Sequence, residues 1–354
     1  RFNKNDSLFF QHAGYEDLKI KKSTVQNFVK LQSLNNILDN IVVVGDKNEN
    51  NRKNVAEKKI YISSYEIESL SAANTAELLE KKGGVSVQRS QLGGGSPNIR
   101  GFEANKVLLV VDGVRLNNAI YRSGHLQNII TVDEYMLEDI EVIFGPSSVL
   151  FGSDALGGTI NMRTKPIYFR DKPLFQGAWL SNMNTAYNSL KNNLSFRFES
   201  NKFSTSTSVS FKKYGDLKMG DSRFHGYKEW GLTHHYVDEE DNFVCNPTPS
   251  IQRSIGYSQF DILNKMMFRL SGNWRITTNF QLSNSSNIPR FDKVNDNDDS
   301  CNTDSLGVCL AAQNLKFHSY YYGPQKRVFS SINLTGFEHF FEKSEFIFAY
   351  QQVS

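Results

Sequence analysis

The second half of the chain alternates between apolar and polar residues with a period of two. The clear runs are 190–198, 203–211 and 257–270, and weaker ones occur at 274–282, 327–337 and 345–350. Because successive side chains of a strand point to opposite faces, each run predicts a strand with one apolar and one charged or polar face. Strands of this kind are typical of β-barrels whose outer wall lies in lipid.

The composition agrees with a barrel. Aromatic residues make up 12% of the 354 residues, with 26 Phe and 15 Tyr, although the mean hydropathy is −0.45. No apolar run approaches the roughly 20 residues that a membrane helix needs, so any membrane crossing has to come through strands. A soluble all-β protein is the alternative that composition leaves open. The net charge of +3 does not indicate a polyanionic partner, and we expect no nucleic acid.

The connections between these strands alternate in length. A few residues near 201, 272 and 342 join neighbouring runs, whereas the segments 215–256 and 286–325 are long. Outer-membrane barrels combine short periplasmic turns with long extracellular loops in this way. We expect about seven strands, which is fewer than the roughly 22 that surround a plug in transporters. The sequence therefore predicts an incomplete antiparallel transmembrane β-barrel and an internal fragment of a longer protein.

Before the strands, four signals follow one another in residues 83–165. They are Asn98-Ile99-Arg100-Gly101-Phe102, the apolar run 107–114 that breaks at Asp112-Gly113, the segment 137–143 with Gly145-Pro146-Ser147-Ser148, and 150–161 with its Gly157-Gly158. Together and in this order, the four signals are highly specific. The stretch resembles the plug domain of TonB-dependent outer-membrane receptors. Residues 117–127, Asn-Asn-Ala-Ile-Tyr-Arg-Ser-Gly-His-Leu-Gln, make it most similar to the haem and haemoglobin receptors of that family.

The resemblance implies four parts. Residues 1–22, where a strand, a turn and a strand are expected, resemble the end of a carboxypeptidase-regulatory-like β domain, a short β-sandwich remnant. Residues 23–59 are a linker with a TonB-box-like run, 60–166 a mixed α/β plug domain, and 167–354 the first strands of the transmembrane β-barrel.

Local signals predict the elements of the plug. Ser63 or Ser64 and then Asn74 are suited to cap two helices, the second ending at Gly83. A short helix is expected over 133–139, opened by Asp133. Strands are expected at 85–89, 97–102, 106–111, 140–144 and 159–164.

No residue pattern indicates catalysis, so we do not expect an enzyme. The seven histidines are scattered. The densest group, His234 and His235 near acidic residues 238–240, lies in a long loop, where solvation is favoured over a metal site. We expect no bound metal and no resident cofactor.

The family resemblance places residues 117–127 in an outward-facing loop and makes them haem candidates. A neutral His125 imidazole suits haem iron, Arg122 suits a propionate, and the Tyr121 ring could stack on a flat ligand. The alternative is that His125 and Tyr121 pack the loop against the barrel.

An isolated β-branched run lies in the polar linker. Such a run can add as a strand to the sheet of a partner. The resemblance implies that TonB grasps this segment, through Asp39, Ile41, Val42, Val43 and Val44. An ordinary edge strand of the plug is the equal alternative.

Four charged residues lie beside apolar strands of the plug: Arg100, Glu138, Glu141 and Arg163. Charges in such places must be paired or hydrated. We therefore predict a salt-bridge lattice that braces the plug inside a polar lumen. In the barrel, Cys301 and Cys309 share a loop and are candidates for a disulfide, which leaves Cys245 over.

These features give the hypothesis of TonB-dependent active import across the outer membrane of a Gram-negative bacterium. The resemblance favours haem, free or taken from haemoproteins, as the transported ligand. The expected partners are the TonB energy-transducing complex, outer-membrane lipid, haem or a haemoprotein, and a surface lipoprotein. Two alternatives stay open: a siderophore or cobalamin receptor, and, in another class, a surface binding or adhesion protein that a barrel anchors.

Overall fold

The protein is described here by a computed structural model. It covers residues 7–10, 18–21, 29, 58–89, 92–103, 106–116, 129–145, 154–238, 240, 242–270, 273–294, 316–317, 319–336 and 343–354. The chain divides into two compact units, Arg1–Asp46 and Lys47–Ser354. In the first unit, β1 (Ser7–Phe10) pairs antiparallel with β2 (Leu18–Lys21), which confirms the two predicted strands. The predicted TonB-box residues 39–44 lie outside the described residues.

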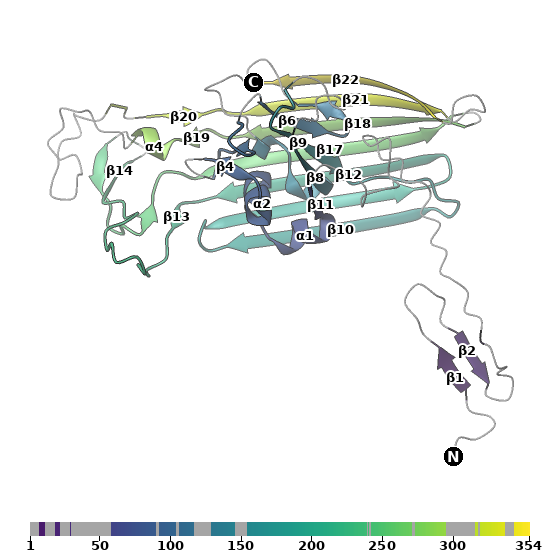
Figure 1. Ribbon diagram of the computed structural model, residues 1–354, viewed down its shortest axis with the longest axis horizontal. Coiled ribbons are helices and arrows are strands. Elements are labelled where there is room, and N and C mark those ends of the chain that lie inside the picture. Colours follow the sequence, from purple (N-terminus) through teal and green to yellow (C-terminus); the bar gives the residue numbers. More distant parts are fainter. Residues whose placement is uncertain are drawn as a thin grey trace. The chain divides into compact units, whose positions relative to one another are not determined.

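The second unit begins with a five-stranded mixed sheet, in the order β3-β8-β9-β6-β7 (Figure 1). Its strands are β3 (Lys59–Ser63), β6 (Val107–Val111), β7 (Val114–Arg115), β8 (Leu137–Phe144) and β9 (Gly158–Thr164). Strands β6 and β9 run parallel, and the other pairs are antiparallel. A separate short pair joins β4 (Ser86–Gln88) to β5 (Ser96–Asn98). The strands predicted for the plug are thus present, with ends that differ by a few residues.

Two short helices pack beside this sheet, α1 (Ser64–Ser69) and α2 (Thr75–Lys82). Ser63 caps α1 in a capping box with Glu66, and the Asn74 side chain accepts a hydrogen bond from the Glu77 amide at 3.0 Å. Helix α2 ends at Gly83, whose φ of +82° suits a residue without a Cβ. The predicted caps and the predicted end are confirmed.

The helix predicted over 133–139 is wrong in length. Asp133 does cap a helix, but that helix is the single 3-10 turn η4 (Glu134–Met136), and β8 begins directly after it at Leu137. The reason is tertiary, because β8 pairs with β3 on one side and with β9 on the other. Hydrogen bonding on both edges outweighs the weak helical preference of a short segment. A second 3-10 turn, η3 (Ile129–Thr131), precedes η4.

The remaining residues form an open antiparallel sheet of seven strands, in the order β10-β11-β12-β17-β18-β21-β22 (Figure 1). The strands are β10 (Leu174–Asn184), β11 (Ser189–Glu199), β12 (Phe203–Tyr214), β17 (Tyr257–Arg269), β18 (Trp274–Ser285), β21 (Lys326–Gly336) and β22 (Ser344–Val353). The predicted strand number and the antiparallel order are confirmed. The described residues contain no helix that is long and apolar enough to span a membrane.

The two faces of this sheet are reversed relative to those of a soluble protein. On β11, Leu194 and Phe196 are each 44% exposed, whereas Lys191 and Asn193 are each 1% exposed. On β12, the serines at 204, 206, 208 and 210 are all buried. The polar face is covered by the plug elements that lie against the sheet in Figure 1. An apolar outer face and a polar inner face are the pattern of a lipid-facing barrel wall.

Short elements lie in the long connections, which share one end of the sheet (Figure 1). In the connection 215–256, β13 (Leu217–Lys218) pairs with β16 (Ile251–Gln252), and β14 (His235–Val237) pairs with β15 (Phe243–Cys245). In the connection 286–325, β19 (Ile288–Pro289) pairs with β20 (Tyr321–Tyr322), and α4 (Phe291–Val294) follows β19. The short connection between β11 and β12 lies at the opposite end of the strands, whereas the turn 185–188 between β10 and β11 lies at the same end as the long connections.

The outward direction of Leu194 can be tested with a charge. We expect Leu194→Arg to lower the stability of the folded barrel by about 2–4 kcal/mol, because an arginine in mid-strand would face lipid. The measurement is refolding of the complete protein into bilayers over a urea series.

The matched control is Phe224→Arg, since Phe224 lies in the long connection and is 99% exposed. Here we expect a change of less than about 0.5 kcal/mol. Equal losses for the two variants would contradict the assignment of the outer face.

Candidate functional site

Two regions of the second unit combine polar chemistry with burial or a cavity. The first is the interface between the plug and the inner face of the large sheet. The second is a cavity between the two long connections. We treat both as the candidate site, because these are the places where polar side chains are buried or line a cavity.

The interface is centred on five buried charges, which we call the five-charge cluster: Lys191, Lys212, Asp133, Glu134 and Asp261. The Lys212 Nζ atom lies 2.6 Å from Asp133 Oδ1, 2.6 Å from Glu134 Oε2 and 3.7 Å from Asp261 Oδ2. The Lys191 Nζ atom lies 3.1 Å from Glu134 Oε1. The cluster therefore joins η4 of the plug to three neighbouring strands of the wall, β11, β12 and β17.

Neutral groups satisfy the rest of the cluster. The Ser210 hydroxyl donates to Asp133 Oδ2, and the Gln259 amide donates to both Asp261 oxygens at 2.9 and 3.0 Å. Lys191 also donates to the Ala72 carbonyl. The ring of Tyr135 lies 5.1 Å from the Lys191 Nζ atom and 5.9 Å from that of Lys212. Buried charges are tolerated only where partners of this kind surround them.

The electrostatics of Glu134 follow from its two lysine partners. Burial raises the pKa of the Glu134 carboxyl, but the charges of Lys212 and Lys191 outweigh it and lower the pKa to about 2. Glu134 therefore stays ionised while the plug is in place, and it stabilises the interface above the pH at which an ordinary glutamate titrates.

A second link between plug and wall is made by Asp112, in the turn between β6 and β7. Its backbone has a φ of +48°, a left-handed conformation that aspartate tolerates better than most residues. Its carboxylate accepts hydrogen bonds from the Thr164 amide at 2.9 Å and the Asn279 amide at 2.6 Å. The Lys265 Nζ atom lies 3.4 Å from Asp112 Oδ2. The Asp-Gly break seen in the sequence thus fixes the plug sheet against β17 and β18.

Wall side chains also bind plug backbone carbonyls directly. The Tyr214 hydroxyl donates to the Ala73 carbonyl at 2.6 Å, and Gln259 donates to the Ile130 carbonyl at 2.8 Å. The guanidinium of Arg327, which is 1% exposed, contacts the Thr131 carbonyl at 3.5 Å and Gln281 Oε1 at 3.1 Å. Irregular segments of the plug are therefore held in place by the wall.

Three of the four bracing residues predicted from the sequence contact other residues of the plug. The Arg163 Nε atom lies 2.6 Å from Asp139 Oδ1, and Glu141 lies 3.2 Å from the Lys59 Nζ atom. The Arg100 guanidinium lies 5.3 Å from the centroid of the Phe144 ring. For Glu138, burial and the neighbouring Asp139 raise the pKa of the carboxyl.

The ion pairs that cross from plug to wall use other residues, which the sequence reasoning did not name. A signal existed, since Lys191 and Lys212 occupy polar positions of the period-two pattern in two neighbouring strands. Inward-facing lysines require carboxylate partners across the interface. The cap residue Asp133 and the adjacent Glu134 provide them.

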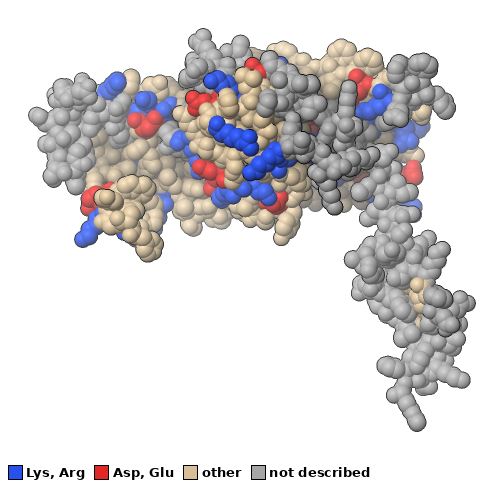
Figure 2. All heavy atoms as spheres, viewed as in Figure 1, with Lys and Arg blue, Asp and Glu red and all other residues tan. Residues whose placement is uncertain are grey.

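The charges on the plug's outer face are arranged differently. Figure 2 shows lysine, arginine, aspartate and glutamate gathered over the part of the molecule where Figure 1 places the plug elements. Among them are the pairs Arg89–Glu80, at 2.7 Å, and Lys82–Glu66. The Lys82 ammonium and the Ser63 amide lower the pKa of the Glu66 carboxyl. These exposed pairs contribute little to stability, in contrast to the buried five-charge cluster.

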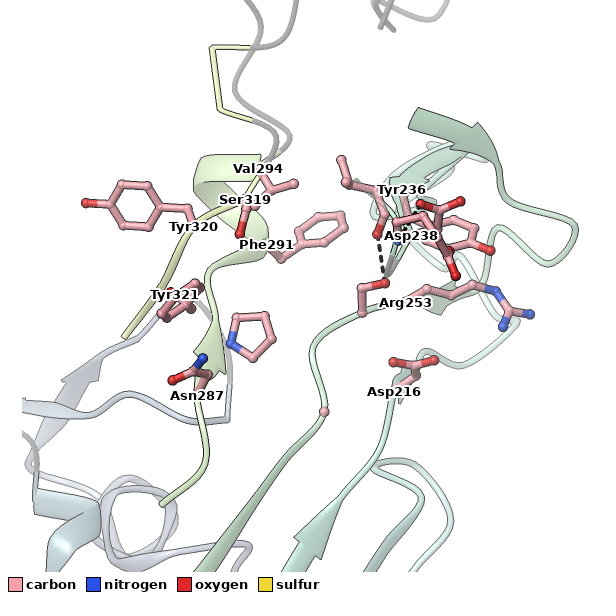
Figure 3. A pocket seen from close by; sticks show the side chains of 15 residues that line it. Asp216, Tyr236, Asp238, Arg253, Asn287, Phe291, Val294, Ser319, Tyr320 and Tyr321 are labelled. Atoms are coloured by element: carbon pink, nitrogen blue, oxygen red, sulfur yellow. Dashed lines mark hydrogen bonds between the residues drawn. The ribbon is translucent and has the colours of Figure 1, made fainter. Parts of the chain in front are cut away.

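The cavity has a volume of about 760 Å³ and lies between the connections 215–256 and 286–325 (Figure 3). One wall is polar and acidic, with Asp216, Asp238 and Ser254. The opposite wall carries apolar, aromatic and amide side chains, among them Asn287, Phe291 and Tyr321. Phe291 points into the space between the two walls in Figure 3. The cavity thus offers stacking surfaces on one side and hydrogen-bond acceptors on the other.

Contacts within the loops determine which groups of the acidic wall are engaged. The Asp238 carboxylate accepts from the Asn242 amide at 2.8 Å, which shapes its own turn. The Arg253 Nε atom donates to Asn246 Oδ1 at 3.0 Å, and its guanidinium lies 5.8 Å from the Tyr236 ring. Asp216 accepts a long hydrogen bond, 3.5 Å, from the Ile255 amide. Its carboxylate is therefore weakly engaged and can accept further hydrogen bonds.

The other candidate residues are placed as follows. His234 lies 3.2 Å from Glu229, and His235 stacks on Phe243 at 4.9 Å. Within the described residues, no group of three or more histidine, cysteine, aspartate or glutamate side chains is arranged to hold a metal ion. The haem candidates Tyr121, Arg122 and His125 and the disulfide candidates Cys301 and Cys309 lie outside the described residues.

Comparison with known proteins identifies the fold. Residues 51–159 match the family model of the TonB-dependent receptor plug domain. The ferric enterobactin receptor PfeA of Pseudomonas aeruginosa has a similar structure, with a TM-score of 0.55 and 18% identity, over 83% of this chain and 40% of that one. At that identity, the likeness speaks for the fold alone.

Two curated relatives are similar in sequence over part of the chain. The vitamin B12 transporter BtuB of Vibrio vulnificus (strain CMCP6) is 39% identical over 128 residues, which is 36% of this chain and 20% of the relative. The heme/hemopexin utilization protein C of Haemophilus influenzae (strain ATCC 51907 / DSM 11121 / KW20 / Rd) is 37% identical over 133 residues, 36% of this chain and 17% of the relative. The matched region spans less than a quarter of either relative.

Residues 51–159 thus carry a plug domain of the TonB-dependent receptor family, and the strands that follow it have the fold of the barrel wall in a solved receptor of that kind. Receptors of this family lie in the outer membrane of Gram-negative bacteria. BtuB of a second V. vulnificus strain, YJ016, supports the longer assignment, with 27% identity over 300 residues that include the strands.

Loss of Lys212 tests whether the five-charge cluster holds the plug to the wall. We expect Lys212→Met to lower the free energy of plug unfolding by about 3–5 kcal/mol, because it leaves Asp133 and Glu134 buried with too few cations. Pulse proteolysis of the complete receptor in a urea series would measure the change.

Lys213→Met is the matched control. Lys213 is the next residue of the same strand and is exposed, so the same substitution removes a charge on the opposite face. We expect a change of less than about 0.5 kcal/mol. A similar loss in both variants would show that the cluster does not hold the plug.

Proposed function

We propose that this chain is part of a receptor that imports a large, scarce solute across the outer membrane with energy delivered through TonB. The observation that carries the proposal is the plug itself, a folded domain fixed by buried polar contacts to the inner face of a lipid-facing sheet. A solute cannot pass such a wall by diffusion while the plug is seated. Passage requires the plug to move, and movement against several buried ion pairs requires work.

Haem is the solute that we favour. The support is the segment 117–127, with His125, Arg122 and Tyr121, and the similarity of the plug to a protein named for haem and hemopexin utilisation. An imidazole for the iron, a guanidinium for a propionate and a ring for stacking are the groups that haem requires. The carboxylates of the loop cavity suit the anionic propionates poorly, so the proposed haem contact is on the plug loop.

Cobalamin and siderophores are the alternatives within transport. The chain is 39% identical over 128 residues to a vitamin B12 transporter, and a structural neighbour is a ferric enterobactin receptor. The loop cavity favours cobalamin over an anionic siderophore, because an acidic wall with hydrogen-bond acceptors suits amide donors and repels anions. For each of these solutes, the cavity is the proposed place of first contact outside the membrane.

The ligand is tested with haemin and the purified complete receptor. We expect a shift of the Soret band on binding, and an at least tenfold weaker affinity for His125→Ala, since one iron ligand is lost. His225→Ala is the control, because His225 is a loop histidine that stacks on Tyr227 and Trp230. It should bind haemin as the unmodified receptor does.

Two results would overturn the choice of haem. One is the absence of any haemin-dependent spectral change together with tight binding of cyanocobalamin, which would favour cobalamin. The other is unchanged haemin affinity in His125→Ala. Growth on haem as the sole iron source should follow the same order among the variants.

The dependence on TonB is tested by deleting residues 39–44. We expect uptake to fall to background while surface binding persists, because strand addition to TonB is lost. Uptake that continues would favour the adhesion alternative, in which the barrel is only an anchor. Participation of a surface lipoprotein stays a prediction, to be checked by co-purification with the complete receptor.

A further inference from the structure

The five-charge cluster contains more carboxylates than cations. Asp133, Glu134 and Asp261 supply three negative charges, and Lys191 and Lys212 supply two positive ones. If all five groups were ionised, the cluster would carry a net charge of −1. All five side chains are at most 9% exposed. An uncompensated charge in such a place is costly, and a carboxyl group avoids the cost by binding a proton.

The groups that surround the cluster do not supply the missing positive charge. From β12, the Tyr214 hydroxyl donates to the Ala73 carbonyl at 2.6 Å, so it is present as a neutral donor. From η4, Tyr135 contributes its ring. From β17 and β18, the neutral Gln259 and Ser283 bond to one another at 3.3 Å beside Asp261.

A further cation on the wall is Arg327 of β21, which lies level with Asp261 in the register of the sheet, two strands away. Its guanidinium is directed to Gln281 Oε1 and to the Thr131 carbonyl. The contacts of the three carboxylates with cations are thus made by Lys191 and Lys212, within the described residues.

We propose that the five-charge cluster binds one proton while the plug is seated and releases it to water when the plug leaves the wall. The proton is shared on the side of Lys212 where Asp133 and Asp261 face the same ammonium group. Glu134 is ionised, because it has both lysines as partners. On release, Asp133 and Glu134 leave with the plug and all three carboxylates become hydrated, so the shared proton dissociates.

The electrostatics on the plug side agree with this division. Burial and the neighbouring Glu134 raise the pKa of the Asp133 carboxyl, although Lys212 opposes them. The pKa of Glu134 is lowered to about 2, because Lys212 and Lys191 outweigh the effect of its burial. The pKa values of the adjacent Asp133 and Glu134 are thus shifted in opposite directions, so that Asp133 tends to keep a proton and Glu134 tends to lose one.

The sign of the pH dependence follows. The seated state binds one more proton than the released state at a pH between the ordinary carboxyl pKa and the raised pKa of the cluster. The equilibrium constant for seating the plug against the wall therefore falls as the pH rises through that window, by up to about tenfold per pH unit. Glu134 acts in the opposite direction, but only between about pH 4.5 and pH 2, so the two effects are separate.

The consequence for transport rests on the proposed function. If the receptor works by displacing its plug, the displacement is easier at neutral pH than at pH 5, and each displacement releases a proton. The protonation itself does not depend on which solute is carried. A receptor that binds no haem can still bind this proton. Failure of the haem proposal therefore does not decide the protonation proposal, and the reverse also holds.

The experiment measures hydrogen exchange of the plug amides at 134–144 in the complete receptor between pH 5 and pH 8, corrected for the intrinsic pH dependence of exchange. In the unmodified receptor, we expect protection to fall as the pH rises, with a slope of up to tenfold per unit. In Asp261→Asn, the cluster is neutral without a bound proton. There we expect strong protection and no slope over this range.

Asp112→Asn is the matched control for a lost contact. It removes the carboxylate of another ion pair between plug and wall, in which a single carboxylate, Asp112, faces a single cation, Lys265. Protection should be lower at every pH, and the slope should equal that of the unmodified receptor. A flat profile in the unmodified receptor, or an unchanged slope in Asp261→Asn, would overturn the proposal.

A second measurement uses the unmodified receptor alone and does not depend on whether a variant folds. Infrared difference spectra of the unmodified receptor between pH 5 and pH 8 should show the carbonyl band of one protonated, water-excluded carboxyl group that disappears as the pH rises. If no such band is present at pH 5, the seated cluster holds no proton and the proposal is wrong.

Discussion

The polar inner face of the large sheet is the constraint on which the structure depends. Strands that expose leucine and phenylalanine to lipid must turn their other side chains inward, and in this chain those are lysine, serine, asparagine, glutamine and aspartate. Buried polar groups need partners. The plug provides them, so its surface is shaped by the wall as much as by its own core.

This requirement explains why the plug is irregular where it meets the wall. The segments around Ala72–Ala73 and Ile130–Thr131 present backbone carbonyls to the inner face of the wall. Lys191, Tyr214, Gln259 and Arg327 bind these carbonyls from the wall. A regular helix in these positions would use the same carbonyls internally and leave the wall unsatisfied. The irregular 3-10 turn η3 therefore suits the interface.

The sequence predicts well what depends on local periodicity or on a single cap. The period-two pattern predicts the strands and their faces, and Ser63 and Asn74 predict two helix starts. The sequence predicts poorly those features that depend on partners distant in the chain. Lys191 and Glu134 are 57 residues apart in the chain, and the alternation places Lys191 inward without showing what lies opposite. The early end of η4 also depends on distant partners, because the residues from Leu137 onward form β8, which pairs with β3 and β9. The haem and TonB contacts rest on resemblance alone and stay predictions.

The choice of ions for this interface has a physical rationale. Well-packed apolar side chains are often as stable as a buried ion pair, or more so. An apolar interface would expose hydrophobic surface to water whenever the plug moved, and the exposed area would set a large energy of opening. Charged groups instead regain hydration on release, which offsets much of the lost attraction. An ionic interface therefore fixes the position of the plug while it is seated, and it requires only a moderate free energy to separate. The odd carboxylate of the five-charge cluster adjusts that work further, since its ionisation opposes closure and its protonation favours it.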